Sequence, residues 1–113
     1  MCNQLQHLFI YGSLCPGRTN EHILKEIGGT FQPAFVKGYL IHEGWGAEMG
    51  FPAITLNPEG KKVPGYVFSS VNLESFWDVL DAFEGKEYKR VAVNAHLGEE
   101  KVMEAYIYVL NRD

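Results

Sequence analysis

Apolar residues recur along the chain with two different spacings, one typical of strands and one typical of a helix. Short apolar or alternating runs bounded by Gly, Pro, Asn or Asp are typical of β-strands. Six segments have this pattern: 7–11, 34–42, 52–56, 65–70, 88–95 and 102–110. The last two flank a turn and are predicted to pair as a hairpin. In the second segment, Gly38 is predicted to form a bulge.

The segment 72–84 has the spacing of an amphipathic helix. Its apolar residues recur every three or four positions, which places them on one face of the helix. They are Leu73, Phe76, Trp77, Leu80 and Phe83. Asn72 is predicted to cap the first turn, and Gly85 is predicted to end the helix. A shorter helix is predicted over 20–27, before a pair of glycines.

The balance of elements predicts an α+β fold. One well-formed helix and one short helix among about six strands do not show the strict βαβ alternation of a doubly wound parallel sheet. We therefore predict a mixed, mainly antiparallel and strongly curved sheet that closes into a small barrel flanked by the two helices. The length of 113 residues predicts a single domain over residues 1–113.

Composition argues against several classes of partner. The formal net charge is −4 and no basic patch or stripe is present, so nucleic acid is not a predicted partner. No apolar run reaches the roughly 18 residues that a membrane span needs, and the N-terminus lacks the pattern of a secretory leader. The two cysteines, Cys2 and Cys15, are too few for a disulfide framework, so we expect a cytoplasmic protein.

Residues 12–19, GSLCPGRT, come close to the phosphate-binding P-loop pattern G-x-x-x-x-G-K-[ST]. Arg18 stands where the pattern has lysine, and Pro16 removes one backbone N–H from a loop that binds phosphate through such groups. No apolar run ending in Asp is present to hold magnesium, so nucleotide binding is not predicted. The turn after Tyr11 either presents consecutive N–H groups to a carboxylate or an oxyanion, or is a plain tight turn.

Glu84 is an acidic residue on the apolar face of the predicted long helix. It follows Leu80 by four positions and so continues the apolar stripe, which predicts an inward side chain. It also lies in the last turn, where the helix dipole is negative. Burial and the dipole both raise the pKa of a carboxyl group, which suits a general base working near neutral pH. The alternative is a side chain that reaches solvent or pairs with Lys86 or Arg90.

Other polar residues carry weaker signals. Asp78 and Asp81 lie off the apolar stripe and are predicted to be solvated, which argues against a carboxylate pair of Asp81 with Glu84. The histidines, at 7, 22, 42 and 96, have no HExxH or CxxC companion, so a metal site is not predicted. Nothing in the local sequence activates Cys15 as a nucleophile.

Three stretches taken together resemble a known family. They are FIYGSL near the N-terminus, VPGYVF in the middle and LDAFEGKEYKRVAV at the end of the long helix. They follow, in order, the pattern YG[ST]L, G-x-[VL]-[YF], LD-x-x-EG and Y-x-R, which resembles the γ-glutamylcyclotransferase family, also called AIG2-like, in its small bacterial members. The resemblance covers nearly the whole chain and implies a small β-barrel flanked by helices. The chain is shorter than many members, so insertions that shape the leaving-group side are missing or reduced.

The resemblance also implies a substrate cavity and assigns residues to it. Tyr11, Gly12, Ser13 and Leu14 match the turn that holds the substrate, Tyr88 matches a tyrosine that lines the pocket, and Glu84 matches the acid/base glutamate. Arg90 matches the last residue of Y-x-R, with either a structural or a functional role.

The reaction that the resemblance implies needs no cofactor. The α-amino group of a small γ-glutamyl compound attacks its own γ-carbonyl, which releases an amine and 5-oxoproline. The leaving amine stays open: a free amino acid, the ε-amine of lysine, another amine or part of a biosynthetic intermediate. Two further readings stay open as well, a non-catalytic module that binds a small acidic metabolite and an amide hydrolase or acyl transferase that uses the same glutamate.

Overall fold

A computed structural model of the chain describes residues 6–11, 17, 21–41, 53–85, 88–98 and 100–110. The strands and helices within these ranges are β1 (Gln6–Ile10), α1 (Glu21–Ile27), β2 (Thr30–Ile41), β3 (Ala53–Leu56), β4 (Lys61–Ser70), α3 (Leu73–Glu84), β5 (Tyr88–His96) and β6 (Val102–Leu110). Each corresponds to an element that the sequence predicted. Within the described ranges, neither helix combines the length and the apolar character that crossing a membrane requires.

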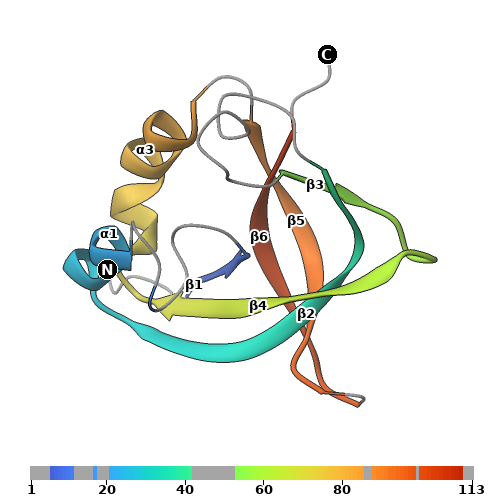
Figure 1. Cartoon of the computed structure of the whole chain (residues 1–113). Helices are drawn as coiled ribbons and strands as arrows, with labels where there is room; N and C mark the ends of the chain where they lie inside the picture. The colour runs from blue at the N-terminus through green and yellow to red at the C-terminus, as the bar shows by residue number, and fades with distance from the viewer. Residues whose placement is uncertain are drawn as a thin grey trace.

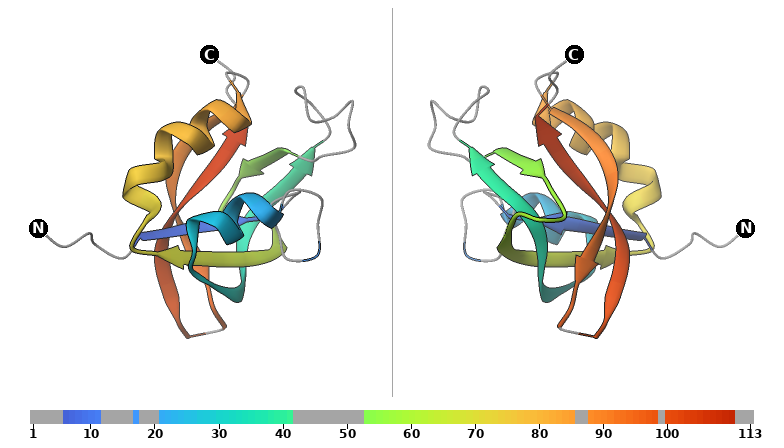
Figure 2. Two further views of the ribbon diagram at one scale, coloured as in Figure 1. Left: turned by 90° about the vertical axis from the view of Figure 1, so that its left-hand side faces the viewer. Right: turned by 90° about the vertical axis from the view of Figure 1, so that its right-hand side faces the viewer.

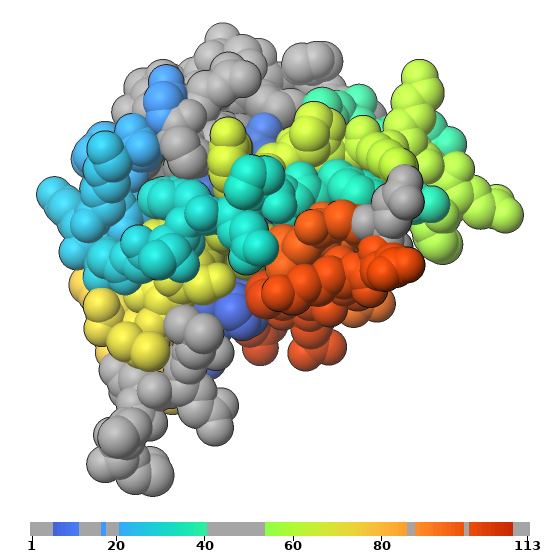
Figure 3. Space-filling view, turned by 90° about the horizontal axis from the view of Figure 1, so that it is seen from below, coloured from blue at the N-terminus to red at the C-terminus, as the bar shows by residue number. Residues whose placement is uncertain are grey.

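The strands form one sheet that closes on itself. Their order is β3-β2-β4-β1-β6-β5, and β2 also pairs with β5 through the bridge between Phe35 and His96. Five strands therefore make a barrel, and β3 is added at the side of β2 (Figure 1). Figure 3 shows β2 lying against the β5–β6 hairpin where the barrel closes. The strands pair antiparallel except β1 with β6, which are parallel at Leu8 and Tyr106, so the predicted mixed barrel is confirmed.

Apolar side chains fill two layers because neighbouring residues of a strand point to opposite faces. One layer lies inside the barrel; it comprises Phe9, Val36, Ile54, Val63, Val67, Ala95, Ala105, Ile107 and Val109. The other lies between the barrel wall and the helices; it comprises Leu8, Ile10, Leu24, Ile27, Phe68, Leu73, Trp77, Leu80 and Tyr108. Figure 2 shows α1 and α3 on the same side of the barrel, over this second layer.

The helix ends follow the predicted glycines but not the predicted side-chain cap. Gly28 and Gly85 both have positive φ, 85° and 86°, and end α1 and α3. Asn72 stands at the start of α3, yet its side chain makes no capping bond. Its Nδ2 instead donates to the carbonyl of Ile27 at 2.8 Å, which joins the end of α1 to the start of α3. Asn72 is therefore the N-cap residue, as predicted, but its side chain is used for a contact between the two helices and not for a capping bond.

Strands β2 and β4 begin four residues before their predicted starts at 34 and 65. They pair with each other over nine residues, from Thr30 opposite Ser69 to Gly38 opposite Lys61. Pro33 and Pro64 lie inside these strands, although proline is uncommon there because it has no N–H to donate to a neighbouring strand. The local pattern predicted that both strands start just after these prolines. Pairing between distant segments extends them to include the prolines.

The predicted bulge at Gly38 is wrong. Gly38 pairs in regular register with Lys61 on one side and Leu56 on the other. A Cβ at this position would overlap the carbonyl oxygen of Thr55, so the glycine permits the close approach of β3 to β2.

Gly65 has a similar role where β4 meets the end of β1. A Cβ there would overlap the carbonyl oxygen of Ile10 and lie 2.8 Å from the ring of Phe9. We expect Gly65→Ala to lower the free energy of unfolding by about 1–3 kcal/mol, because backbone atoms must move to admit the methyl group. Urea unfolding measures this difference.

Gly98→Ala is a comparison without overlap, since its methyl group would meet nothing within 4 Å, but its φ of +148° adds a backbone cost that Gly65 does not have. It reports the cost of the backbone conformation alone. An unchanged free energy of unfolding in Gly65→Ala would contradict the steric explanation.

Candidate active site

Glu84 is the last residue of α3 and is partly buried. It continues the helix face on which Leu73, Trp77 and Leu80 are buried, as the spacing predicted. Gly85 closes the turn by donating its N–H to the carbonyl of Asp81 at 3.1 Å. In Figures 1 and 2 this end of α3 lies at the same end of the barrel as the C-terminal end of β6.

The environment of Glu84 favours its neutral form. Burial raises the pKa of Glu84 from 4.5 to about 7. The position in the last helical turn acts in the same direction, because the helix dipole disfavours negative charge there. A carboxyl with this pKa is present in both protonation states near neutral pH, so it can accept a proton and return it.

Tyr11 follows the last residue of β1 and its ring packs against the interior of the barrel. Its hydroxyl donates to the backbone carbonyl of Tyr108 at 2.7 Å. Burial raises the pKa of Tyr11, and the charges of Glu84 and Tyr88 raise it further. Such charge effects require proximity. The structure therefore brings Tyr11, Glu84 and Tyr88 together, three of the residues that the sequence proposed for one site.

Gly12, Ser13 and Leu14 lie outside the described residues, and their role in holding the substrate stays a prediction. The described chain reaches Tyr11, the first residue of the YGSL motif, at the end of β1. The charge of Glu84 acts on Tyr11, so the motif begins within electrostatic range of this carboxyl group.

Tyr108 belongs to this site although the sequence analysis did not single it out. It is buried on β6, and its hydroxyl donates to Oδ1 of Asp81 at 2.6 Å. Burial, the bond to Asp81 and the charges of Asp81 and Glu84 raise the pKa of Tyr108, while Arg90 acts against them. A tyrosine in an alternating strand has the same local pattern as a core residue, so no local signal distinguishes it.

Asp81 was predicted to be solvated, and this holds only in part. Its side chain is 44% exposed, but Oδ1 accepts the bond from Tyr108 and Oδ2 lies 3.7 Å from Nη2 of Arg90. The guanidinium of Arg90 also lies over the ring of Trp77, 4.3 Å from its centroid. The ion pair that the structure shows for Arg90 is thus with Asp81, and these contacts hold α3 to the barrel.

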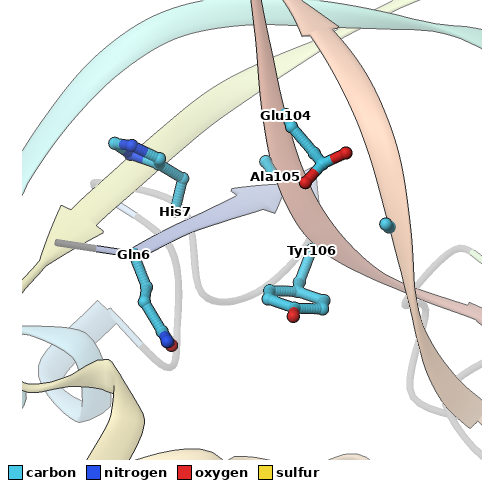
Figure 4. A pocket seen from close by; sticks show the side chains of 6 residues that line it. Gln6, His7, Glu104, Ala105 and Tyr106 are labelled. Carbon is cyan, nitrogen blue, oxygen red and sulfur yellow. The ribbon is translucent and has the colours of Figure 1, made fainter. Parts of the chain in front are cut away.

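A groove of about 220 Å³ lies elsewhere, where β1 and β6 separate (Figures 3 and 4). It is lined by Gln6, His7, Ala92, Glu104, Ala105 and Tyr106. Figure 4 shows Gln6 and Tyr106 pointing to one side of the strands and His7 to the other. Gln6 accepts a bond from the Trp77 indole at 2.6 Å, and His7 shares one of 2.6 Å with the Ser69 hydroxyl. Two of the polar groups of this groove are therefore already bound within the fold.

Comparisons with known proteins bear on the family and the fold of this chain. Residues 8–113 match the family model described as gamma-glutamyl cyclotransferase, AIG2-like. No curated protein gives a significant match to the chain.

Several solved structures share the fold. The crystal structure of an AIG2-like protein from mouse superposes with a TM-score of 0.73 at 20% identity, over 97% of this chain and 80% of that one. YkqA from Bacillus subtilis has a TM-score of 0.71 at 26% identity, and this chain covers 36% of its length with 96% of its own. A structure described as a gamma-glutamyl cyclotransferase has a TM-score of 0.70 at 21% identity, over 96% of this chain and 68% of that one.

Proposed function

We propose, on the premise that this chain belongs to the gamma-glutamyl cyclotransferase, AIG2-like family, that it cyclises a small γ-glutamyl amide or amine with Glu84 as general acid/base. The observation that carries the proposal is a partly buried carboxyl with a pKa of about 7 at the end of α3. It shares its surroundings with Tyr11, the first residue of the YGSL motif. A site that only bound an anion would gain nothing from an acid beside it.

The proposed reaction moves two protons from the attacking nitrogen to the leaving nitrogen, one of them through Glu84. The α-amino group of the substrate is mostly an ammonium at pH 7 and cannot attack in that form. The carboxylate of Glu84 takes one proton, and the free amine forms a bond to its own γ-carbonyl carbon. The amide bond to the leaving nitrogen then breaks as Glu84 returns the proton to that nitrogen. Ring closure also releases the second proton of the attacking nitrogen, which ends on the released amine. The products are 5-oxoproline and the amine as its ammonium, with no water consumed.

The tyrosines and the turn after β1 give the substrate its position in this proposal. Tyr11 and Tyr88 contact the bound substrate near the carboxyl group of Glu84 in this proposal, and the N–H groups of Gly12, Ser13 and Leu14 hold the substrate carboxylate or the oxyanion. Because the attack is intramolecular, holding the cyclised conformer can supply about 7–11 kcal/mol of the barrier reduction. Proton transfer by Glu84 contributes roughly 3–5 kcal/mol more.

A mass-spectrometric screen of γ-glutamyl compounds tests the function. The set contains γ-glutamyl amino acids, ε-(γ-glutamyl)lysine and γ-glutamyl amines, each incubated with the protein and with Glu84→Gln. We expect 5-oxoproline and the free amine from at least one compound with the wild type alone. Free glutamate in place of 5-oxoproline would indicate hydrolysis. Binding without any product at high protein concentration would indicate a binding module.

The pH dependence of kcat/KM should follow the carboxyl group of Glu84. The reaction needs the deprotonated form, so activity is lost as pH falls through a pKa of about 7. We expect kcat/KM to fall about tenfold for each pH unit below that value and to level off above it. Initial rates between pH 5 and 9 give the profile. A midpoint near 4.5, the ordinary value, would contradict the proposed role.

A further inference from the structure

We propose that Tyr108, Asp81 and Arg90 are positioning residues that hold the last turn of α3, and with it Glu84, at the end of the barrel. This inference rests on the proposed role of Glu84 in the cyclotransferase reaction. It assigns a function to the contacts among these three residues, which do not touch the reacting atoms.

Asp81 ties the last turn of the helix to the sheet. It precedes Glu84 by three positions, and residues so spaced are neighbours on a helix surface. Its carbonyl accepts the N–H of Gly85 at 3.1 Å, so the backbone of Asp81 starts the turn that contains Glu84. Its side chain contacts two strands at once, with Tyr108 on β6 at 2.6 Å and Arg90 on β5 at 3.7 Å.

Arg90 is held in place from several sides. It lies directly opposite Tyr108 in the register of β5 and β6. Its guanidinium lies 4.3 Å from the ring centroid of Trp77 and 5.4 Å from that of Tyr106. The flat guanidinium thus packs between helix and strand while one nitrogen faces Asp81, an arrangement that a lysine ammonium does not reproduce.

Tyr108 connects this network to the candidate substrate turn. Its hydroxyl binds Asp81 on α3, and its carbonyl accepts the hydroxyl of Tyr11 at 2.7 Å. Through these two bonds, Tyr108 fixes the position of Glu84 on α3 relative to that of Tyr11 after β1. A displacement of about 1 Å between a catalytic group and its substrate can cost about 100-fold in rate, so this relation matters for turnover.

The variant Tyr108→Phe tests the inference, because it removes the hydroxyl and keeps the ring and the carbonyl that Tyr11 uses. Titration of the Glu84 carboxyl by carbon NMR reports its surroundings without any substrate. Among the described residues, the charge of Glu84 acts on Tyr11 and Tyr108, and these two tyrosines also feel Tyr88, Asp81 and Arg90. We expect the midpoint to move from about 7 toward 4.5, since a loosened turn lets the carboxyl reach water. On an active substrate we expect kcat to fall about 10- to 100-fold with KM within about twofold.

Tyr106→Phe is the matched control. Tyr106 precedes Tyr108 by two positions on the same face of β6, and its ring contacts Trp77 and Arg90. Loss of its hydroxyl leaves the bond between Tyr108 and Asp81 intact, so both the titration and kcat should match the wild type. Where Tyr108→Phe does not fold, Arg90→Lys replaces it, because it keeps the charge but loses the flat contact with Trp77. We expect the same direction of change.

The two proposals fail in different ways. A wild-type protein that releases no 5-oxoproline from any compound overturns the proposed function, and the titration still decides whether Tyr108 positions Glu84. An unchanged Glu84 midpoint in Tyr108→Phe overturns the positioning role, whether or not the protein is active. A shifted midpoint with wild-type kcat overturns the link between that position and turnover.

Discussion

Replacing Glu84 with glutamine is expected to lower turnover by about 10²- to 10⁴-fold while leaving the fold and ligand binding in place. Glutamine has nearly the shape of the protonated carboxyl but cannot accept the proton of the substrate ammonium. The pKa of about 7 means that Glu84 is available as a base at neutral pH and can still act as an acid toward the leaving nitrogen. Loss of this group removes roughly 3–5 kcal/mol of transition-state stabilisation.

Initial-rate measurements on the compound found active in the screen give the loss of turnover in Glu84→Gln. Glu74→Gln is the control, since Glu74 is an exposed acid in the first turn of the same helix, at the opposite end from the site. It should keep turnover close to that of the wild type. Binding of the same compound to Glu84→Gln, measured by calorimetry, separates lost chemistry from lost affinity. Turnover of the glutamine variant within a few-fold of the wild type would refute the acid/base role.

The same substitution is expected to stabilise the protein above neutral pH. Glu84 has a pKa of about 7 when folded and 4.5 as the ordinary value. Between these values the folded chain binds more protons than the unfolded chain, so the free energy of unfolding falls as pH rises through this window. Glutamine does not titrate. Compared with Glu84→Gln, the wild type therefore loses almost no free energy of unfolding to this group at pH 4 and about 3 kcal/mol at pH 8.

Urea unfolding of both proteins at pH 4.5 and pH 8 measures the effect. Glu84→Gln should be the more stable protein at pH 8, and the difference should shrink toward pH 4.5. Glu74→Gln should behave in the opposite way at pH 8, losing about 0.3–1 kcal/mol, because an acid near a helix N-terminus is favourable. A difference between wild type and Glu84→Gln that does not depend on pH would contradict the raised pKa. A stabilised but inactive variant also excludes unfolding as the cause of lost turnover.

Much of the architecture was readable from local patterns. The long helix, the closing hairpin and the inward position of Glu84 follow from residue spacing, because a helix repeats every 3.6 residues and a strand every two. The glycines at 28 and 85 end their helices with positive φ, as their lack of a Cβ permits. The family resemblance followed from motifs that are short and contiguous. The upward shift of the Glu84 pKa was also predictable, since it depends on the burial that the helical spacing predicts.

Local sequence patterns did not predict the contacts between distant segments. Tyr11 and Tyr108 lie 97 positions apart, and Tyr108 and Asp81 lie 27 apart. Nothing local to Asp81 distinguishes a solvated acid from one that binds two strands. The role of Gly65 likewise depends on β4 passing close to the end of β1.

The sequence by itself determined which segments become helix or strand and which face of the long helix turns inward. Only the tertiary structure decided the register of β2 with β4, the roles of Asn72 and Gly38, and the grouping of Glu84 with three tyrosines from distant parts of the chain. The physical reason is that periodicity and backbone preference act over a few residues, whereas pairing and burial depend on where the closed barrel brings distant residues together.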